Sequence, residues 1–278
     1  MSRVAPERRV TRLTLGEAPV SRRDTLAGEE PLEIRVGGRS LAVTMRTPGA
    51  DFDLAAGFLV SEGVVAAKEE LVALRYCAGE AEGVNTFNVL DATLAPHVAP
   101  PGESTARAFF TTSSCGLCGK ASIDAVRTTS RFDLTSDPLT VEAAVLATLP
   151  ERLREAQAVF SATGGLHAAA LADGASGELL CVREDVGRHN AVDKVVGWAL
   201  REGRLPLSGT VLVVSGRASF ELVQKAAMAG VAMLAAVSAP SSLAVELAEE
   251  TGMGLVGFLR PPSMVVYANP QRVLTPIP

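Results

Sequence analysis

The chain has 278 residues, of which 47% are hydrophobic and 21% charged, the composition of a soluble globular protein that can bury a sizeable core. A formal net charge of -5 argues against the basic face that sequence-independent nucleic-acid binding requires. The longest apolar run, Ala226 to Val237, is too short to cross a bilayer of about 30 Å, and the N-terminus lacks the apolar segment of a signal peptide. These features predict a cytoplasmic protein without a nucleic-acid or membrane partner.

The first half of the chain predicts a flexible arm over residues 1–25 and then a β-rich N-terminal region over residues 26–110. Turn-forming Gly37-Gly38 and the possible helix cap Asp51 delimit its elements. These elements are strands at 33–36 and 41–45, a helix from Asp51 to Gly63, and a strand at 86–90. A Pro- and Gly-rich segment over residues 96–102 is the best linker candidate.

The second half alternates continuous apolar strands with amphipathic helices. The predicted strands are 179–182, 211–214, 233–237 and 255–258, and the predicted helices are 192–200, 220–228 and 243–250. This alternation indicates an α/β fold with a mostly parallel sheet covered on both faces. We therefore expect an α/β cofactor-binding core over residues 138–278, preceded by a loop and linker over residues 111–137.

Polar residues collect where these four strands end. The four segments, which we call the rim, are Arg183–Asn190, Ser215–Ser219, Ser238–Ser242, and Arg260 with Ser263. Ligands of open α/β sheets bind beyond the carboxyl ends of the strands, and Gly, Ser and Arg at helix starts offer donors to anions. Each loop alone is equally well explained by helix caps and solvated arginines, but four loops on one edge favour a site for phosphates or another polyanion.

The segment 111–120 contains a Cys-x-x-Cys pair, Cys115 and Cys118, among glycines and small hydroxyl residues, which favours a mobile loop. Zinc is disfavoured because no second pair exists and the three histidines lack ligand spacing, so no metal site is predicted. Dithiol exchange and sulfur carriage as a persulfide both remain open. Cys77 and Cys181 are expected to be small buried side chains.

Six motifs in order resemble a known family. They are Glu30–Ile34, Met45–Gly49 with Asp53–Leu59, Thr112–Gly119 around the two cysteines, Thr163–Ala169, Arg183–Lys194, and Ser215–Arg217 with Glu221–Lys225. This series is similar to the FdhD family of formate dehydrogenase accessory sulfurtransferases, from about Glu30 to the Asn269–Arg272 tail. The chain departs from the family pattern at Pro261-Pro262, in a stretch where members of the family often have Gly and Asn.

The resemblance implies a cytidine-deaminase-like three-layer α/β/α core, a homodimer, and binding of molybdenum bis(molybdopterin guanine dinucleotide) as substrate. It implies sulfur transfer from a cysteine desulfurase to that cofactor before it enters formate dehydrogenase. Cys115 would carry the persulfide and Cys118 would be its partner. A non-catalytic delivery chaperone is the alternative. The cofactor-binding residues expected from the resemblance and the rim together are Phe258, Leu259, Arg260, Pro261, Pro262, Ser263, Arg183, Arg188, His189, Ser215, Gly216, Arg217 and Ser219.

Deaminase chemistry is excluded despite the implied fold. Zinc deaminases need a His-x-Glu sequence followed by Pro-Cys-x-x-Cys, whereas here the cysteine pair comes first and His167 has no such Glu. His189, in a turn before a helix, is predicted to contact a ligand or local polar groups. His167 fits a buried, hydrogen-bonded imidazole equally well. Glu184 and Asp185 are expected to orient arginines or to accept hydrogen bonds from the ligand.

Overall fold

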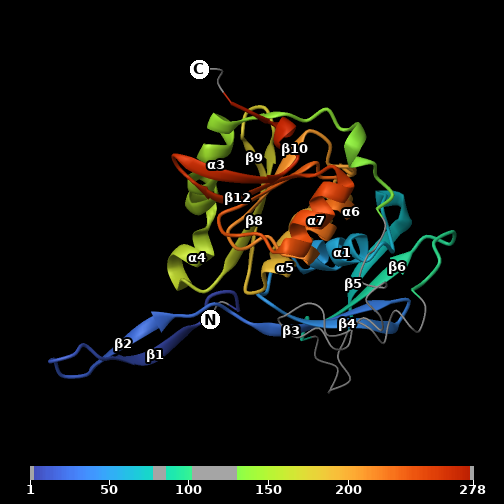
Figure 1. The fold of residues 1–278 in the computed structure, drawn as a ribbon. Coiled ribbons are helices and arrows are strands. Elements are labelled where there is room, and N and C mark those ends of the chain that lie inside the picture. Colours follow the sequence, from blue (N-terminus) through green and yellow to red (C-terminus); the bar gives the residue numbers. More distant parts are fainter. Residues whose placement is uncertain (1–2, 78–85, 102–129, 276–278) are drawn as a thin grey trace.

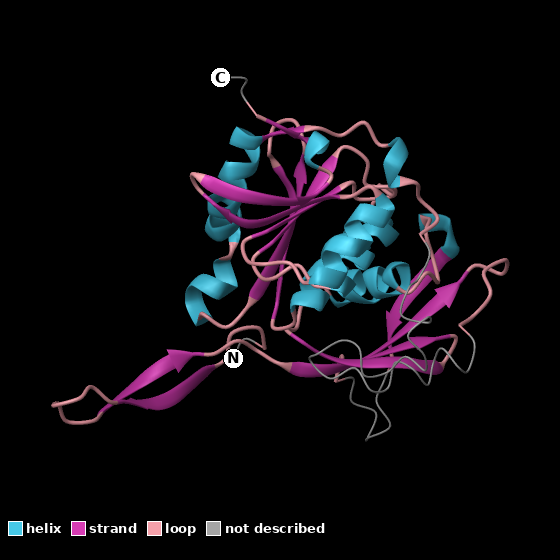
Figure 2. Ribbon diagram, viewed as in Figure 1, coloured by secondary structure: helices cyan, strands magenta, loops and turns pink. Residues whose placement is uncertain are grey.

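The computed structural model describes residues 3–77, 86–101 and 130–275. Its centre is a six-stranded sheet with the strand order β13-β12-β11-β10-β8-β9 (Figures 1 and 2). These strands are β8 (His167–Asp173), β9 (Leu179–Asp185), β10 (Thr210–Val214), β11 (Met233–Ala236), β12 (Gly254–Arg260) and β13 (Ser263–Ala268). A two-stranded pairing of β7 (Val141–Glu142) with β14 (Val273–Leu274) lies outside this sheet.

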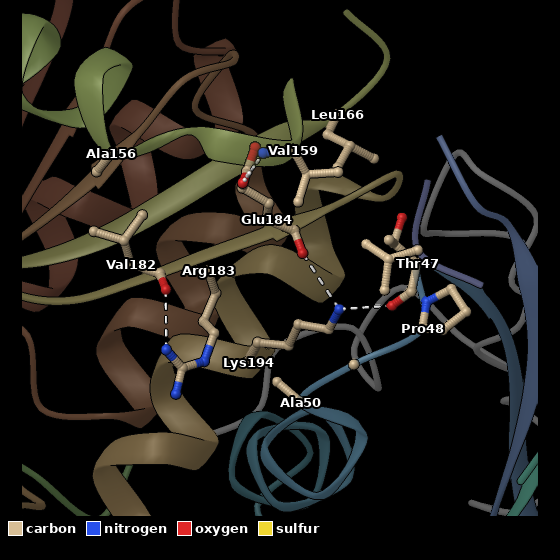
Figure 3. A pocket seen from close by; sticks show the side chains of 12 residues that line it. Thr47, Pro48, Ala50, Ala156, Val159, Leu166, Val182, Arg183, Glu184 and Lys194 are labelled. Carbon is tan, nitrogen blue, oxygen red and sulfur yellow. Dashed lines mark hydrogen bonds between the residues drawn. The ribbon is translucent and has the colours of Figure 1, made fainter. Parts of the chain in front are cut away.

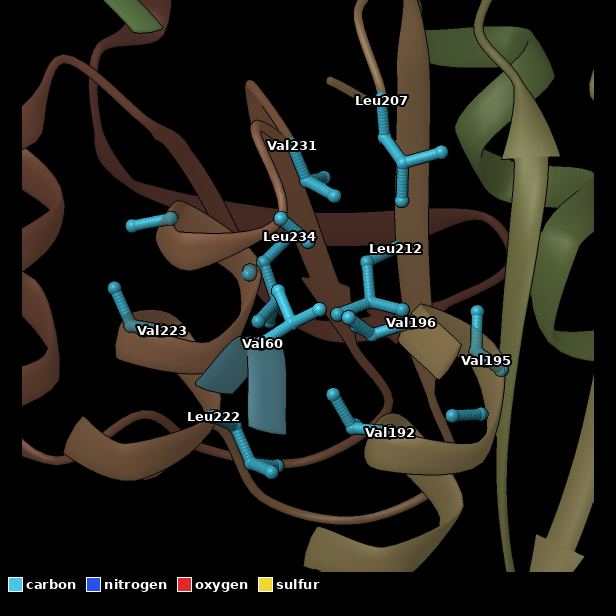
Figure 4. Close-up of a cluster of buried hydrophobic side chains, with 14 of the residues drawn as sticks. Val60, Val192, Val195, Val196, Leu207, Leu212, Leu222, Val223, Val231 and Leu234 are labelled. Atoms are coloured by element: carbon cyan, nitrogen blue, oxygen red, sulfur yellow. The ribbon is translucent and has the colours of Figure 1, made fainter. Parts of the chain in front are cut away.

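Helices cover both faces of the central sheet. One face packs on α3 (Ala143–Ala156), which is followed by the short α4 (Ala158–Thr163). The other face packs on α1 (Asp51–Ser61), α5 (Arg188–Arg201), α6 (Phe220–Met228) and α7 (Ser242–Thr251) (Figures 1 and 4). Strand β10 shows the division, because Val211 and Val213 face the α3 side while Leu212 and Val214 face α5 and α6. The fold therefore has three layers.

The N-terminal region is a second sheet with the order β4-β3-β6-β5. Its strands are β3 (Glu30–Val36), β4 (Arg39–Arg46), β5 (Leu71–Tyr76) and β6 (Val89–Leu94). Helix α1 joins this sheet to the central one, since Leu54 and Ala55 pack on Leu32, Ile34 and Leu90. The opposite side of α1 packs closely on α5. Short 3₁₀ helices span Lys68–Glu70, Leu134–Ser136 and Pro270–Arg272.

A hairpin of β1 (Glu7–Arg12) and β2 (Val20–Thr25) lies in the segment expected to be a flexible arm. Figure 1 shows it extending away from the rest of the molecule. Its base is fixed by hydrogen bonds from Leu26 N to Pro6 O and from Gly28 N to Val4 O, at 2.9 and 2.8 Å. In the part of the chain that the structure describes, no helix combines the length and apolar character needed to span a membrane.

The predicted hairpin around Gly37-Gly38, the helix after Asp51, and the regular strands and helices of the second half are all confirmed, with small shifts at their ends. The strand predicted at 86–90 is displaced, since β6 begins only at Val89. The likeness to cytidine deaminases and the domain boundaries stay predictions.

The prediction of a mostly parallel sheet is wrong. Only the β10–β11 and β11–β12 pairs are parallel, because β8 enters antiparallel between β9 and β10, and β13 is antiparallel to β12. The sequence of β8 is rich in alanine, which has weak strand preference, so it gave no clear strand signal. Because β8 is antiparallel to both β9 and β10, however, those two strands run in the same direction. Strands β9, β10, β11 and β12 therefore all run in one direction. Their carboxyl ends share one edge, as predicted.

Candidate functional site at the rim

The rim forms a continuous edge of the central sheet. Backbone hydrogen bonds connect its parts from strand to strand, from Ser215 N to Ala168 O (3.0 Å), from Ser238 N to Gly216 O (3.2 Å), and from Phe258 N to Ser238 O (3.2 Å). The start of β8, the loops after β10 and β11, and the end of β12 are therefore neighbours. The first turn of α5, which follows β9, lies at the same edge.

Three buried polar atoms of the rim have no hydrogen-bond partner among the described residues. They are Arg188 Nε, His189 Nε2 and Ser219 Oγ, at the starts of α5 and α6. A buried polar group without a partner costs about 1–3 kcal/mol, so such groups in a native fold call for an explanation. All three can donate a hydrogen bond, and helix N-termini add positive potential. Arg188 Nε is therefore available to an anionic ligand such as a nucleotide diphosphate, whereas His189 Nε2 and Ser219 Oγ also face the carboxylate of Glu221.

His167, for which the sequence left two interpretations open, lies beside the rim segment Ser215–Ser219. It is the first residue of β8, and a β-carbon placed on Gly216 would lie 3.5 Å from His167 Nδ1. Burial lowers the pKa of its imidazole, and the nearby Arg188 and His189 lower it further. A neutral imidazole therefore faces the same edge as Arg188 and His189. Its position follows from β8, the strand that sequence reasoning missed.

A carboxylate lies near His189, the histidine within the rim. His189 Nε2 lies 3.9 Å from Glu221 Oε2, the second residue of α6, and both side chains are about four-fifths buried, with exposures of 19% and 20%. Burial alone would raise the pKa of the Glu221 carboxyl, but His189 and Ser219 favour its charged form and the pKa is lowered to about 2. Sequence reasoning did not single out Glu221 as a site residue.

Several predicted site residues make hydrogen bonds within the fold. Arg183 lies inside β9, where its Nη2 donates to Asp53 Oδ2 of α1 at 2.8 Å, so it joins two regions of the fold. Glu184 accepts hydrogen bonds from Val159 N and Phe160 N at the start of α4. Ser215 Oγ accepts one from Ala168 N at 2.9 Å. Arg183 and Glu184 were placed at the rim because β9 was predicted to end three residues too early.

The end of β12 contains both buried and available groups. Leu259 is fully buried in the core on the α3 side, so its side chain cannot reach a ligand at the rim. Phe258 is 40% exposed and has φ = 47°, a left-handed conformation that is costly for a bulky residue. Arg260 and Ser263 face each other across the Pro261-Pro262 turn and are exposed. Arg217 is exposed as well and makes no ion pair with the described residues.

A separate cavity of about 170 Å³ lies between the Thr47–Ala50 turn, β9 and α4 (Figure 3). Its polar groups are already paired. Lys194 Nζ lies 2.7 Å from Asp185 Oδ2 and donates to the carbonyl oxygens of Thr47 and Glu184. Because its lining is largely apolar and its charged groups have partners, the cavity offers little to an anionic ligand. The rim is the better candidate.

The two described cysteines do not provide a reactive thiol at the rim. Cys181 is buried in β9, where burial raises the pKa of its thiol to about 11, and Cys77 is half-buried after β5. Cys115 and Cys118 lie outside the described residues. Within residues 3–77, 86–101 and 130–275, no cluster of three His, Cys, Asp or Glu side chains is arranged to hold a metal ion.

We expect His167 to make the protein less stable in mild acid. Because the folded state lowers the pKa of His167 below 6.5, the unfolded state takes up its proton first as the pH falls. The free energy of unfolding of the wild type should therefore decrease between pH 7 and pH 5 more than that of His167→Gln, measured by denaturant titration. The exposed His97 is the control, and an equal effect of His97→Gln would contradict this assignment.

Comparisons with known proteins place the chain in a family. The model of the FdhD/NarQ family matches residues 27–274. A relative named sulfur carrier protein FdhD from Mycolicibacterium paratuberculosis is 61% identical over 271 residues, which cover 97% of this chain and 99% of the relative. A relative of the same name from Streptomyces avermitilis is 62% identical, with 98% and 97% covered.

The fold is also found in a solved structure. A chain from Desulfotalea psychrophila assigned as a formate dehydrogenase accessory protein superimposes with a TM-score of 0.78 over 98% of this chain and 100% of that chain. At 23% identity, this likeness shows the fold alone. The full-length relatives and the family model together establish that the chain belongs to the FdhD/NarQ family.

Proposed function

We propose that the chain is a sulfurtransferase that supports the maturation of formate dehydrogenase. The observation that carries the proposal is that relatives 61–62% identical over 97–98% of the chain are named sulfur carrier proteins. The sulfur donor would be a cysteine desulfurase, and the acceptor would be molybdenum bis(molybdopterin guanine dinucleotide), bound as a substrate. The protein would act in the cytoplasm, where thiols stay reduced, and as a homodimer.

The rim supports this choice of substrate. A guanine dinucleotide presents diphosphates, and Arg188 Nε, His189 Nε2 and Ser219 Oγ are buried polar atoms without partners among the described residues. The exposed Arg217 and Arg260 add positive charge at the same edge. Phe258, exposed in a left-handed conformation, offers an apolar face beside them.

Cys115 is the proposed carrier. Its thiolate attacks the terminal sulfur of a donor persulfide, so that a new S–S bond forms on Cys115 and the donor cysteine leaves as a thiolate. Release of the carried sulfur as hydrosulfide requires two electrons. The thiolate of Cys118 supplies them by attacking the inner sulfur, which leaves a Cys115–Cys118 disulfide that a cellular thiol must reduce before the next cycle.

Intact mass spectrometry tests the carrier role. After incubation with a cysteine desulfurase and cysteine, the wild type should gain about 32 Da in a form that a thiol reductant removes. Cys115→Ala should gain nothing, whereas Cys118→Ala should keep the added sulfur. Cys181→Ala is the matched control, because this buried thiol should not contribute.

A delivery chaperone is the competing function. It would bind the cofactor at the rim while the cysteines only help to hold it. If the wild type binds the cofactor but takes up no sulfur from the desulfurase, the sulfurtransferase proposal is wrong and the chaperone function is supported.

A further inference from the structure

The β1–β2 hairpin is exposed along most of its length. Leu13 and Leu15, in the turn at its tip, are 73% and 102% exposed, and Val20 at the start of β2 is exposed as well. A two-stranded hairpin alone in water is at best marginally stable, and exposed apolar side chains at a projecting tip are typical of interaction surfaces. The hairpin therefore calls for a second surface that covers it.

One face of the hairpin combines cationic and apolar side chains. Because cross-strand partners lie on the same face, this face holds the pairs Arg8 with Asp24, Val10 with Arg22, and Arg12 with Val20. Asp24 pairs with Arg22, whereas Arg8 and Arg12 make no ion pair with any residue that the structure describes. At roughly 3.4 Å per residue, their Cα atoms lie about 14 Å apart. The face thus presents two unpaired guanidinium groups with a valine between them.

The rest of the chain has the opposite charge. Residues 1–25 contain six arginines and three acidic residues, which gives this segment a formal charge of +3. Because the whole chain carries -5, residues 26–278 carry -8. Opposite net charges on two parts of one chain favour contact between protomers when the two parts cannot meet within one protomer.

The exposed face of α7 has the pattern that complements the hairpin. Leu243, Glu246 and Glu249 are exposed, and the helix contains no basic residue. Residues three apart lie next to one another on a helix, so the three side chains form one stripe about 9 Å long. Among the residues described, neither Glu246 nor Glu249 has a hydrogen-bond or ion-pair partner. The stripe offers one apolar side chain and two unpaired carboxylates to a cationic, partly apolar face.

A single protomer cannot bring these two faces together. The base of the hairpin is fixed by the hydrogen bonds from Leu26 N and Gly28 N, and β2 contacts α4, which follows α3. Helix α7 packs on the opposite face of the central sheet from α3. Figure 1 shows the hairpin extending away from the molecule and from α7. The complementary surface must therefore come from a second protomer.

We propose that the β1–β2 hairpin of each protomer binds the exposed face of α7 in its partner, so that a two-fold dimer exchanges two hairpins. In such a dimer each protomer supplies both a hairpin and an α7 face. The hairpin, residues 7–25, contributes 19 residues, close to the 20–30 residues a side of a standard stable interface before the α7 face is added. The inference rests on the homodimer of the proposed function and is independent of its sulfur chemistry.

Two charge-reversed variants and their mixture test the exchange. The first variant carries Arg8→Glu and Arg12→Glu, and the second carries Glu246→Arg and Glu249→Arg. Either variant alone places like charges at both contacts, so its dimer should dissociate at least about 100-fold more readily than that of the wild type. Light scattering after gel filtration should then give the mass of a monomer at concentrations where the wild type is a dimer.

Mixing the two variants should restore the dimer. In a mixed dimer the unchanged hairpin of the second variant meets the unchanged α7 of the first, and the reversed hairpin meets the reversed α7. Both contacts again join opposite charges. The control Glu151→Arg with Glu155→Arg makes the same change of charge at exposed positions of α3 and should leave the dimer intact. Circular dichroism checks that every variant is folded, because all the altered side chains are exposed.

The outcomes separate this inference from the sulfurtransferase function. A wild type that is monomeric, folded variants that stay dimeric, or a mixture that stays monomeric would each overturn the hairpin exchange. Sulfur uptake is read independently by intact mass. A monomeric wild type that takes up sulfur overturns the exchange alone, and a dimer that depends on the hairpin but takes up no sulfur overturns the sulfurtransferase alone.

Discussion

Gly57→Ala is expected to lower the free energy of unfolding by about 3 kcal/mol. The effect is opposite in sign to that of the same change in an exposed helix, where alanine is better by about 1 kcal/mol. A β-carbon on Gly57 would lie 1.8 Å from the carbonyl oxygen of Asp193 and 2.8 Å from Gly197 N. Both atoms belong to the backbone of α5, so no side chain can move aside. Helices α1 and α5 must therefore separate.

A shift of α5 away from α1 would also displace the rim residues at the start of α5. Helix α1 joins the N-terminal sheet to α5, and α5 begins with Arg188 and His189. Guanidinium unfolding of Gly57→Ala and of Gly216→Ala provides a matched comparison. The added methyl group at Gly216 would meet His167 at an ordinary 3.5 Å, and its effect should be below about 0.5 kcal/mol. A Gly57→Ala protein as stable as the wild type would show that α1 does not pack on α5 this closely.

The elements of the fold could be predicted where the sequence has a regular pattern of apolar residues. The helix Phe220–Met228 was predicted with its observed bounds, because its apolar residues recur at helical spacing. Strand β8 was missed because four of its seven residues are alanine, which suits a buried sheet but gives no strand signal. The direction of the rim strands survived this error, since an antiparallel strand between two others leaves their directions parallel.

The candidate site was predictable as a location more than as a list of side chains. Arg183 and Arg188 look equivalent in the sequence, yet Arg183 is held by Asp53, 130 residues away, while Arg188 Nε lacks a described partner. Phe258 and Leu259 are neighbours in the sequence, but at a β-bulge where Phe258 is left-handed, Phe258 is exposed and Leu259 is buried. Such distinctions depend on contacts between distant segments, which a local pattern does not contain.

Lys194→Met is expected to destabilise the fold by about 3–5 kcal/mol near neutral pH, the usual cost of leaving a buried charge without its partner. Lys194 and Asp185 are 2% and 0% exposed, and Asp185 also accepts hydrogen bonds from Thr47 N (3.1 Å) and Gly187 N (2.8 Å). The carboxyl is therefore fixed in place at the strand that precedes α5. Without the ammonium group, its charge has no cation to compensate it.

The pH dependence of Lys194→Met identifies the cause of this loss. Burial raises the pKa of the Asp185 carboxyl, while Lys194 acts to lower it, so the substitution raises it further. A carboxyl with a raised folded-state pKa binds its proton more readily in the folded than in the unfolded state, and the variant gains stability relative to the wild type as the pH falls. In denaturant titrations the deficit should be largest at pH 8 and shrink toward pH 5, and adding Asp185→Asn should recover part of it at pH 8. A deficit that is the same at every pH would instead assign the loss to the bonds from Lys194 to the carbonyl oxygens of Thr47 and Glu184.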